Sequence, residues 1–142
     1  MAKHLIDTDL YIDLIQSGTT LPLIRELYGK EAPGIYFSSI VAQELLTGAR
    51  SSASRKRVER LFRPFERVGR VVTPDHKQWK DAGRILAEVL RMRSDFKPKL
   101  PALVNDCLLA FECAVAWSHV VHEEPRRFHA PSERTLLLSG CD

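Results

Sequence analysis

Three carboxylates occur where the surrounding residues predict buried or structural positions. Asp7 ends the short apolar segment of residues 4–7, which we predict to be a strand. Glu44 lies in the apolar stripe of a helix predicted over residues 39–48. Asp106 lies in "LVNDCLLAFECA", where helical spacing aligns it with apolar residues that should form the core. A buried carboxylate needs a partner, so each of these acids calls for an explanation.

A structural role can account for some of these acids singly. Asp7 suits a helix N-cap, and Asp106, in the first turns of its helix, suits the helix dipole. Glu44 is harder to explain, because glutamate is rarely buried without a partner. If the three acids converge, they repel one another unless a divalent cation neutralises them. Oxygen ligands favour Mg²⁺ or Mn²⁺, ions that activate water and bind phosphodiester oxygens, so the acids predict phosphodiester hydrolysis.

A run of basic residues supports a polyanionic partner. The chain carries a net charge of +3, and between residues 50 and 70 only Glu59 and Glu66 oppose the basic side chains. These basic residues are Arg50, Arg55, Lys56, Arg57, Arg60, Arg63, Arg67 and Arg70. Such a run suits a nucleic acid backbone, and an ordinary solvated helix face remains the alternative.

Strands and helices are predicted to alternate along the chain. The predicted strands lie at residues 4–7, around Tyr36, and at 70–72, 118–122 and 135–138. The predicted helices cover residues 8–18, 21–28, 39–48 and 58–69, and two more follow, a long one after 73–75 and a last one beginning near Pro101. The helix over 39–48 has Ser38 or Ser39 as its N-cap, and Pro64 should kink or break the helix over 58–69. Residues 51–57 are expected to be a polar link and 93–101 a loop. This order predicts an α/β fold with a mainly parallel sheet of four to five strands covered on both faces. Chemistry in such folds gathers at the carboxyl ends of the strands.

Size and composition predict one cytoplasmic domain over residues 1–142. Hydrophobic residues make up 44% and charged residues 27%, which is ordinary for a globular protein. The three cysteines, Cys107, Cys113 and Cys141, are an odd number without metal-ligand spacing, so reduced thiols are expected. No segment is long and apolar enough to suggest a membrane span or a secretion signal.

Three segments together resemble the leading motifs of PIN-domain nucleases, in particular VapC-type toxins of bacterial toxin-antitoxin pairs. These segments are "LIDTDLYIDLI", "FSSIVAQELLTGA" and "LVNDCLLAFECA". Asp7, Glu44 and Asp106 match the acids of the first three family motifs. The resemblance implies a three-layer α/β/α sandwich, endoribonuclease activity that depends on Mg²⁺ or Mn²⁺, a cognate antitoxin and a homodimer.

The fourth family motif is only partly matched by "WSHVVHEEPRRF". Trp117 stands where the family tends to have glycine, and His122 stands where it tends to have threonine. Glu124 matches the following Asn or Asp and would be a fourth carboxylate. Arg127 replaces an acid and cannot bind a metal ion.

We therefore predict a metal-dependent ribonuclease that acts as a toxin. The predicted catalytic and metal-binding residues are Asp7, Glu44, Asp106 and Glu124, and the predicted RNA contacts are Arg55, Lys56, Arg57 and Arg60. Thr8 and Asn105 adjoin two of these acids and could orient ligands or waters, and Asp9 could support the ligands, whereas Asp13 is expected in solvent. Two alternatives remain: a PIN domain that binds RNA or an antitoxin without cleavage, and a structural domain whose acids only cap helices.

Overall fold

The computed structural model of the chain describes residues 3–31, 34–116, 119–121 and 138–140. The strands are β1 (His4–Ile6), β2 (Ile35–Ser38), β3 (Val71–Val72), β4 (His119–Val121) and β5 (Leu138–Gly140). The helices are α1 (Thr8–Gln16), α2 (Leu21–Glu31), α3 (Ser39–Gly48), α4 (Ser52–Arg67), α5 (His76–Met92), the 3₁₀-helix η2 (Ser94–Lys99) and α6 (Leu100–Ala116). Residues 118, 122 and 135–137 of the two last predicted strands, and Cys141, lie outside this description.

The sheet has the order β3-β2-β1-β4-β5, with β1 at its centre. Parallel pairing joins β1 to β2, β1 to β4 and β2 to β3, and β5 pairs antiparallel with β4. Three short parallel strands, β2, β1 and β4, form the middle of the sheet. The predicted α/β fold with a mainly parallel sheet is confirmed. Because β1 and its parallel neighbours run in the same direction, their carboxyl ends meet at one edge.

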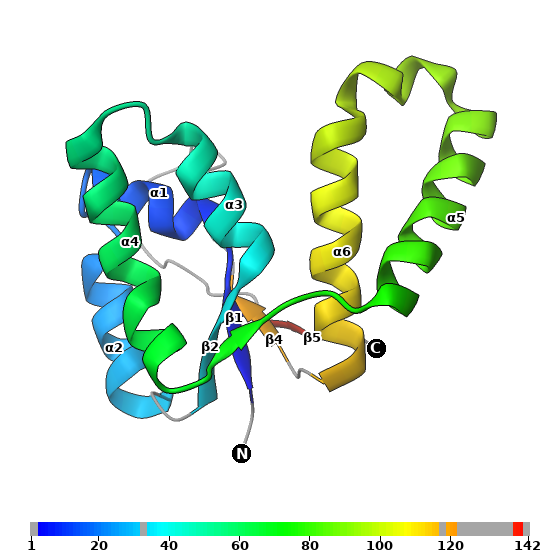
Figure 1. Cartoon of the computed structure of the whole chain (residues 1–142). Coiled ribbons are helices and arrows are strands. Elements are labelled where there is room, and N and C mark those ends of the chain that lie inside the picture. Colours follow the sequence, from blue (N-terminus) through cyan, green and yellow to red (C-terminus); the bar gives the residue numbers. More distant parts are fainter. Residues whose placement is uncertain (1–2, 32–33, 117–118, 122–137, 141–142) are drawn as a thin grey trace, which may run out of the picture.

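Helices flank the sheet on both sides. Figure 1 shows α1 to α4 on one side and the α5–α6 hairpin on the other, and contacts join α1 to α3, α3 to α4 and α5 to α6. Parallel strands need helical connections between them, and these connections cover the faces of the sheet. Within the part of the chain that the structure describes, no helix is both long enough and apolar enough to cross a membrane.

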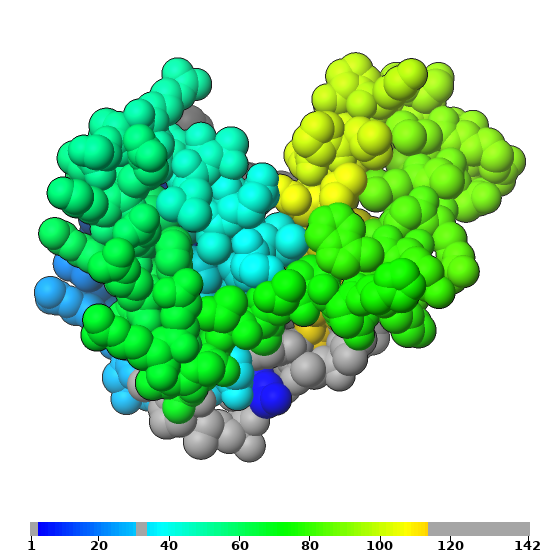
Figure 2. Space-filling model, viewed as in Figure 1, coloured from blue at the N-terminus to red at the C-terminus, as the bar shows by residue number. Residues whose placement is uncertain are grey.

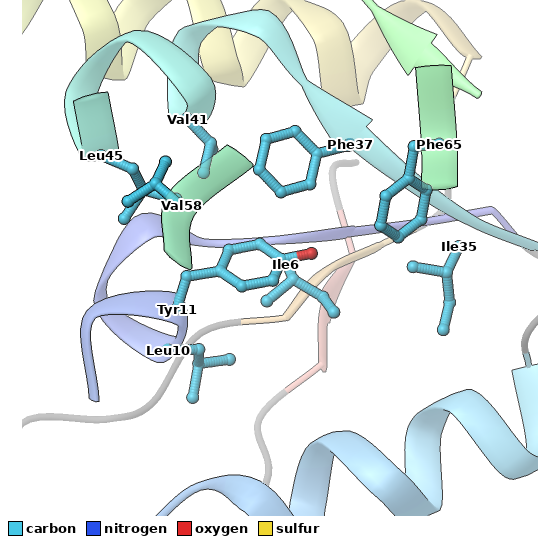
Figure 3. Close-up of a cluster of buried hydrophobic side chains, with 9 residues drawn as sticks. All are labelled: Ile6, Leu10, Tyr11, Ile35, Phe37, Val41, Leu45, Val58 and Phe65. Carbon is cyan, nitrogen blue, oxygen red and sulfur yellow. The ribbon is translucent and has the colours of Figure 1, made fainter. Parts of the chain in front are cut away.

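The main core lies between the sheet and the helices α1 to α4. Figure 3 shows the rings of Tyr11, Phe37 and Phe65 among aliphatic side chains of α1, α3, α4 and the central strands. The ring centroids of Tyr11 and Phe37 are 5.0 Å apart, and those of Phe37 and Phe65 are 5.5 Å apart. These tilted contacts anchor α1 and α4 to β2, because large aromatic rings bury much apolar surface. The carboxyl end of β1 is thereby held rigidly beside α3.

Two segments differ from the sequence-based predictions. Residues 52–57 form the first turns of α4 instead of a polar link, because Ser51 and Ser54 make a capping box that starts the helix there. Pro64 does not end α4, which continues to Arg67. Proline removes one backbone hydrogen bond, and burial of Phe65 in the core keeps the last turn helical. Residues 94–99, expected as loop, form η2.

Candidate active site

Asp7 lies at the carboxyl end of β1, where the sequence placed it. It is the N-cap of α1, with φ −70° and ψ 156°, and its Oδ1 accepts a hydrogen bond of 2.6 Å from the Thr8 amide. The structural explanation as a helix cap is therefore correct. The cap also fixes the direction of the carboxylate, which does not remove its capacity to bind a cation through its remaining lone pairs.

Glu44 is half-buried on α3, and its carboxylate has two hydrogen-bond donors. Thr8 Oγ1 donates to Oε2, and Asn105 Nδ2 donates to Oε1 over 2.8 Å. One donor comes from α1 and the other from α6. These bonds explain how a carboxylate is accommodated within an apolar helix face.

Asp106 is exposed, so the prediction that it points into the core is wrong. The fully buried residue of this part of α6 is Leu108, which packs with Ile40 and Ala82. Residues two apart on a helix point roughly 200° apart, so burying Leu108 turns Asp106 outward. The helix is apolar on several sides, and spacing alone could not identify which side faces α3 and α5.

Asp106 nevertheless interacts with other acids. Partial burial raises the pKa of its carboxyl group above the usual value, and the nearby carboxylates of Glu44 and Asp9 raise it further. The Asp106 carboxylate of α6 is therefore repelled by Glu44 of α3 and by Asp9 of α1. Figure 2 shows an open hollow between the cyan surface of α3 and the yellow surface of α6. The repulsion marks a position where a cation would be stabilised.

Asp13 has a structural role and is not simply solvated as expected. Its Oδ2 accepts a hydrogen bond of 2.7 Å from the Thr20 amide, and its Oδ1 accepts one of 2.6 Å from Ser17 Oγ. These bonds close the turn between α1 and α2. Asp13 is therefore separate from the group formed by Asp9, Glu44 and Asp106.

The site fits Mg²⁺ or Mn²⁺ in the chemistry of its donors. All candidate ligands are carboxylates, and the charges of Glu44 and Asp9 raise the pKa of Asp106, as expected for acids that a cation would join. Among the described residues, no three His, Cys, Asp or Glu side chains lie close enough together to hold one metal ion. Glu124 lies outside the described residues, as do Trp117, His122 and Arg127. A metal site formed by Asp7, Glu44, Asp106 and Glu124 therefore stays a prediction.

The predicted RNA contacts lie on α4. Arg55, Lys56, Arg57 and Arg60 are all exposed, and α4 packs beside α3. The acid Glu59 pairs with Arg63 at 2.8 Å, and no ion pair of the four predicted contacts is found in the part of the chain described. Exposure agrees both with phosphate binding and with a solvated helix face.

The sequence interpretation missed Glu112. Its side chain is only 3% exposed, and its Oε2 accepts a hydrogen bond of 2.7 Å from Ser38 Oγ. Burial raises the pKa of this carboxyl group to about 7, while the Ser38 bond lowers it. Its Oε1 has no hydrogen-bond partner within the described residues. A signal existed in the sequence, because Glu112 is the one charged residue in the apolar segment 107–116, and glutamate within such a segment is rarely buried without a partner.

Comparisons with known proteins support the fold. No model of a protein family matches the chain, and no curated protein matches its sequence. The structure is similar to the crystal structure of DNA-bound VapBC from Salmonella typhimurium, with a TM-score of 0.54 and 26% sequence identity. The alignment covers 80% of this chain and 80% of the chain in that complex. That neighbour is a VapBC complex, so the likeness agrees with the VapC-type family that the three acidic motifs resemble.

Proposed function

We propose that this protein is a VapC-type toxin that cleaves RNA with the aid of Mg²⁺ or Mn²⁺. The observation that carries the proposal is the gathering of acids beside the carboxyl end of β1: Glu44 of α3 accepts a hydrogen bond from Thr8, which follows Asp7, and Asp106 of α6 lies near enough to Glu44 and Asp9 to feel their charge. That place is where an α/β fold gathers its chemistry. The resemblance of three motifs to VapC-type toxins and the likeness to a VapBC complex give this gathering a functional meaning.

In this proposal Asp7, Glu44, Asp106 and Glu124 hold the cation. When bound, Mg²⁺ or Mn²⁺ would lower the pKa of the attacking water and neutralise charge on the phosphate oxygens. The cap at Asp7 and the two hydrogen bonds at Glu44 keep these carboxylates oriented. Asp106 is exposed and can therefore meet the substrate. Preorganised carboxylates avoid the cost of reorganisation during the reaction.

The basic side chains of α4 supply the proposed RNA contact. Arg55, Lys56, Arg57 and Arg60 would bind backbone phosphates without reading sequence. The substrate is single-stranded or looped RNA, because an A-form duplex hides its base edges. The partners are a cognate antitoxin, with a basic side chain that enters the acidic hollow, and a second copy of the chain.

A calorimetric Mn²⁺ titration with RNA cleavage in the same buffer tests this function. The Asp106→Asn and Asp7→Asn variants should lose both binding and cleavage. Asp95→Asn is the matched control, because Asp95 is an exposed acid of η2 that pairs with Arg93 at 2.8 Å. Full cleavage by the Asp7→Asn variant would contradict the proposal.

A non-catalytic PIN domain is the second candidate. It is favoured by Arg127 in place of the expected acid and by the lack of three closely grouped metal ligands among the described residues. Such a protein would bind RNA equally well in chelator and in Mg²⁺ and would not cut it. A gel-shift experiment under both conditions separates the two functions.

A further inference from the structure

The carboxylate of Glu44 is held from both sides by residues far away in the sequence. Thr8, which precedes it by 36 residues, donates its hydroxyl to Oε2, and Asn105, which follows it by 61 residues, donates its amide to Oε1. We call these three residues the Glu44 clasp. The clasp joins α1, α3 and α6, the elements that carry the repelling acids.

The clasp can orient the Glu44 carboxylate and still leave it able to bind a cation. Both donors are neutral, so they orient the carboxylate without cancelling its charge. Each carboxylate oxygen can accept two partners, so one hydrogen bond at each oxygen leaves another lone pair for a cation. Thr8 is buried, with 8% of its surface exposed, and its short side chain leaves the hydroxyl little freedom.

The clasp also ties α3 to α6, because Asn105 of α6 donates to Glu44 of α3 over 2.8 Å. Asn105 adjoins Asp106 on α6 and draws Glu44 toward that helix. Its amide also lies 3.2 Å from Gln43 Oε1, a second bond to α3. Asn105 therefore links the two helices that border the hollow in Figure 2.

We propose that Thr8 and Asn105 are positioning residues that hold Glu44 opposite Asp106 before a cation enters. The inference rests on the proposed function, since it assigns a purpose to Glu44 as a ligand. It makes the expectation that Thr8 and Asn105 orient ligands or waters specific, because both residues donate to the remote Glu44. A purely structural clasp would stabilise the fold and leave the affinity for cations unchanged.

The experiment is a calorimetric Mn²⁺ titration of the full chain and its variants, with the melting temperature of each measured in chelator. Thr8→Val keeps the shape and removes the hydroxyl donor, and Asn105→Ala removes the amide donor. Each should weaken Mn²⁺ binding by about 10-fold to 100-fold, as for other groups that orient metal ligands. Thr8→Ser restores the hydroxyl and should restore most of the affinity.

Thr47→Val is the matched control. Thr47 is an exposed residue of α3 whose hydroxyl bonds the carbonyl oxygen of Gln43 at 2.7 Å, so its loss should not change Mn²⁺ affinity. If the wild type binds Mn²⁺ and both variants bind equally well, the clasp inference is overturned while the nuclease proposal stands. If the wild type binds no Mn²⁺, the proposed function fails and the inference fails with it. Should Thr8→Val not fold, Asn105→Ala and Thr8→Ser decide the outcome.

Discussion

Glu112 should make the stability of this protein fall as the pH rises toward neutrality. Its carboxyl group is buried, and its pKa is about 7 in the folded state against 4.5 for an ordinary glutamate. Between these two values the folded state binds more protons than the unfolded state. The contribution of protonated Glu112 to the free energy of unfolding is therefore complete below pH 4.5 and is lost as the pH passes 7. Each unit of difference between the two pKa values corresponds to 1.36 kcal/mol, so the free energy of unfolding should fall by about 2.5 kcal/mol between pH 5 and pH 8.

Urea unfolding of the wild type and the Glu112→Gln variant at several pH values between 5 and 8 measures this effect. Glutamine keeps an acceptor for Ser38 Oγ but cannot ionise, so the variant should lose most of the pH dependence. Groups that titrate elsewhere affect both proteins equally, so the difference between the two curves isolates Glu112. Two parallel curves would refute the reasoning, because they would show that Glu112 has the same pKa in both states.

Four further predictions concern the core, the helix cap, the acids and the basic helix. Leu108→Ala should lower the free energy of unfolding by about 2–5 kcal/mol in urea titration, because Leu108 is fully buried. Ser51→Ala should cost about 1 kcal/mol in the same assay, since it removes the capping box of α4. Asp106→Asn should raise the melting temperature in chelator, because it relieves repulsion with Glu44; a lower melting temperature would contradict this. Replacing both Arg57 and Arg60 with glutamine should reduce the slope of log affinity against log salt for single-stranded RNA by about 1.4 in filter binding, and an unchanged slope would place the RNA elsewhere.

Local signals made much of the fold predictable. Asp7, Ser38 and Asp75 all cap helices, and each is a polar residue directly before a helical pattern. The alternation of apolar strands with amphipathic helices predicted the α/β class and the parallel sheet, which the structure confirms. Caps and periodicity depend on backbone preferences within a few residues, and a sequence displays them directly.

The errors arose where short-range patterns were ambiguous. Residues 52–57 contain no apolar residue other than Ala53, so no apolar stripe revealed that α4 begins there, and only the bond between Ser51 and Ser54 shows the start. Asp13 has the appearance of a surface acid, yet it caps the turn at Thr20, seven residues away. Such contacts depend on how the chain turns, which residue types alone did not specify.

The sequence by itself determined which acids stand out and which elements carry them, because hydrophobic spacing and helix signals are local. Only the tertiary structure decided which way those acids face. The packing of Leu108 turns Asp106 outward, and contacts that span 36, 61 and 74 residues bring Thr8 and Asn105 to Glu44 and Ser38 to Glu112. An apolar helix such as α6 can bury more than one of its sides, and the choice is made by the shape of the elements it packs against.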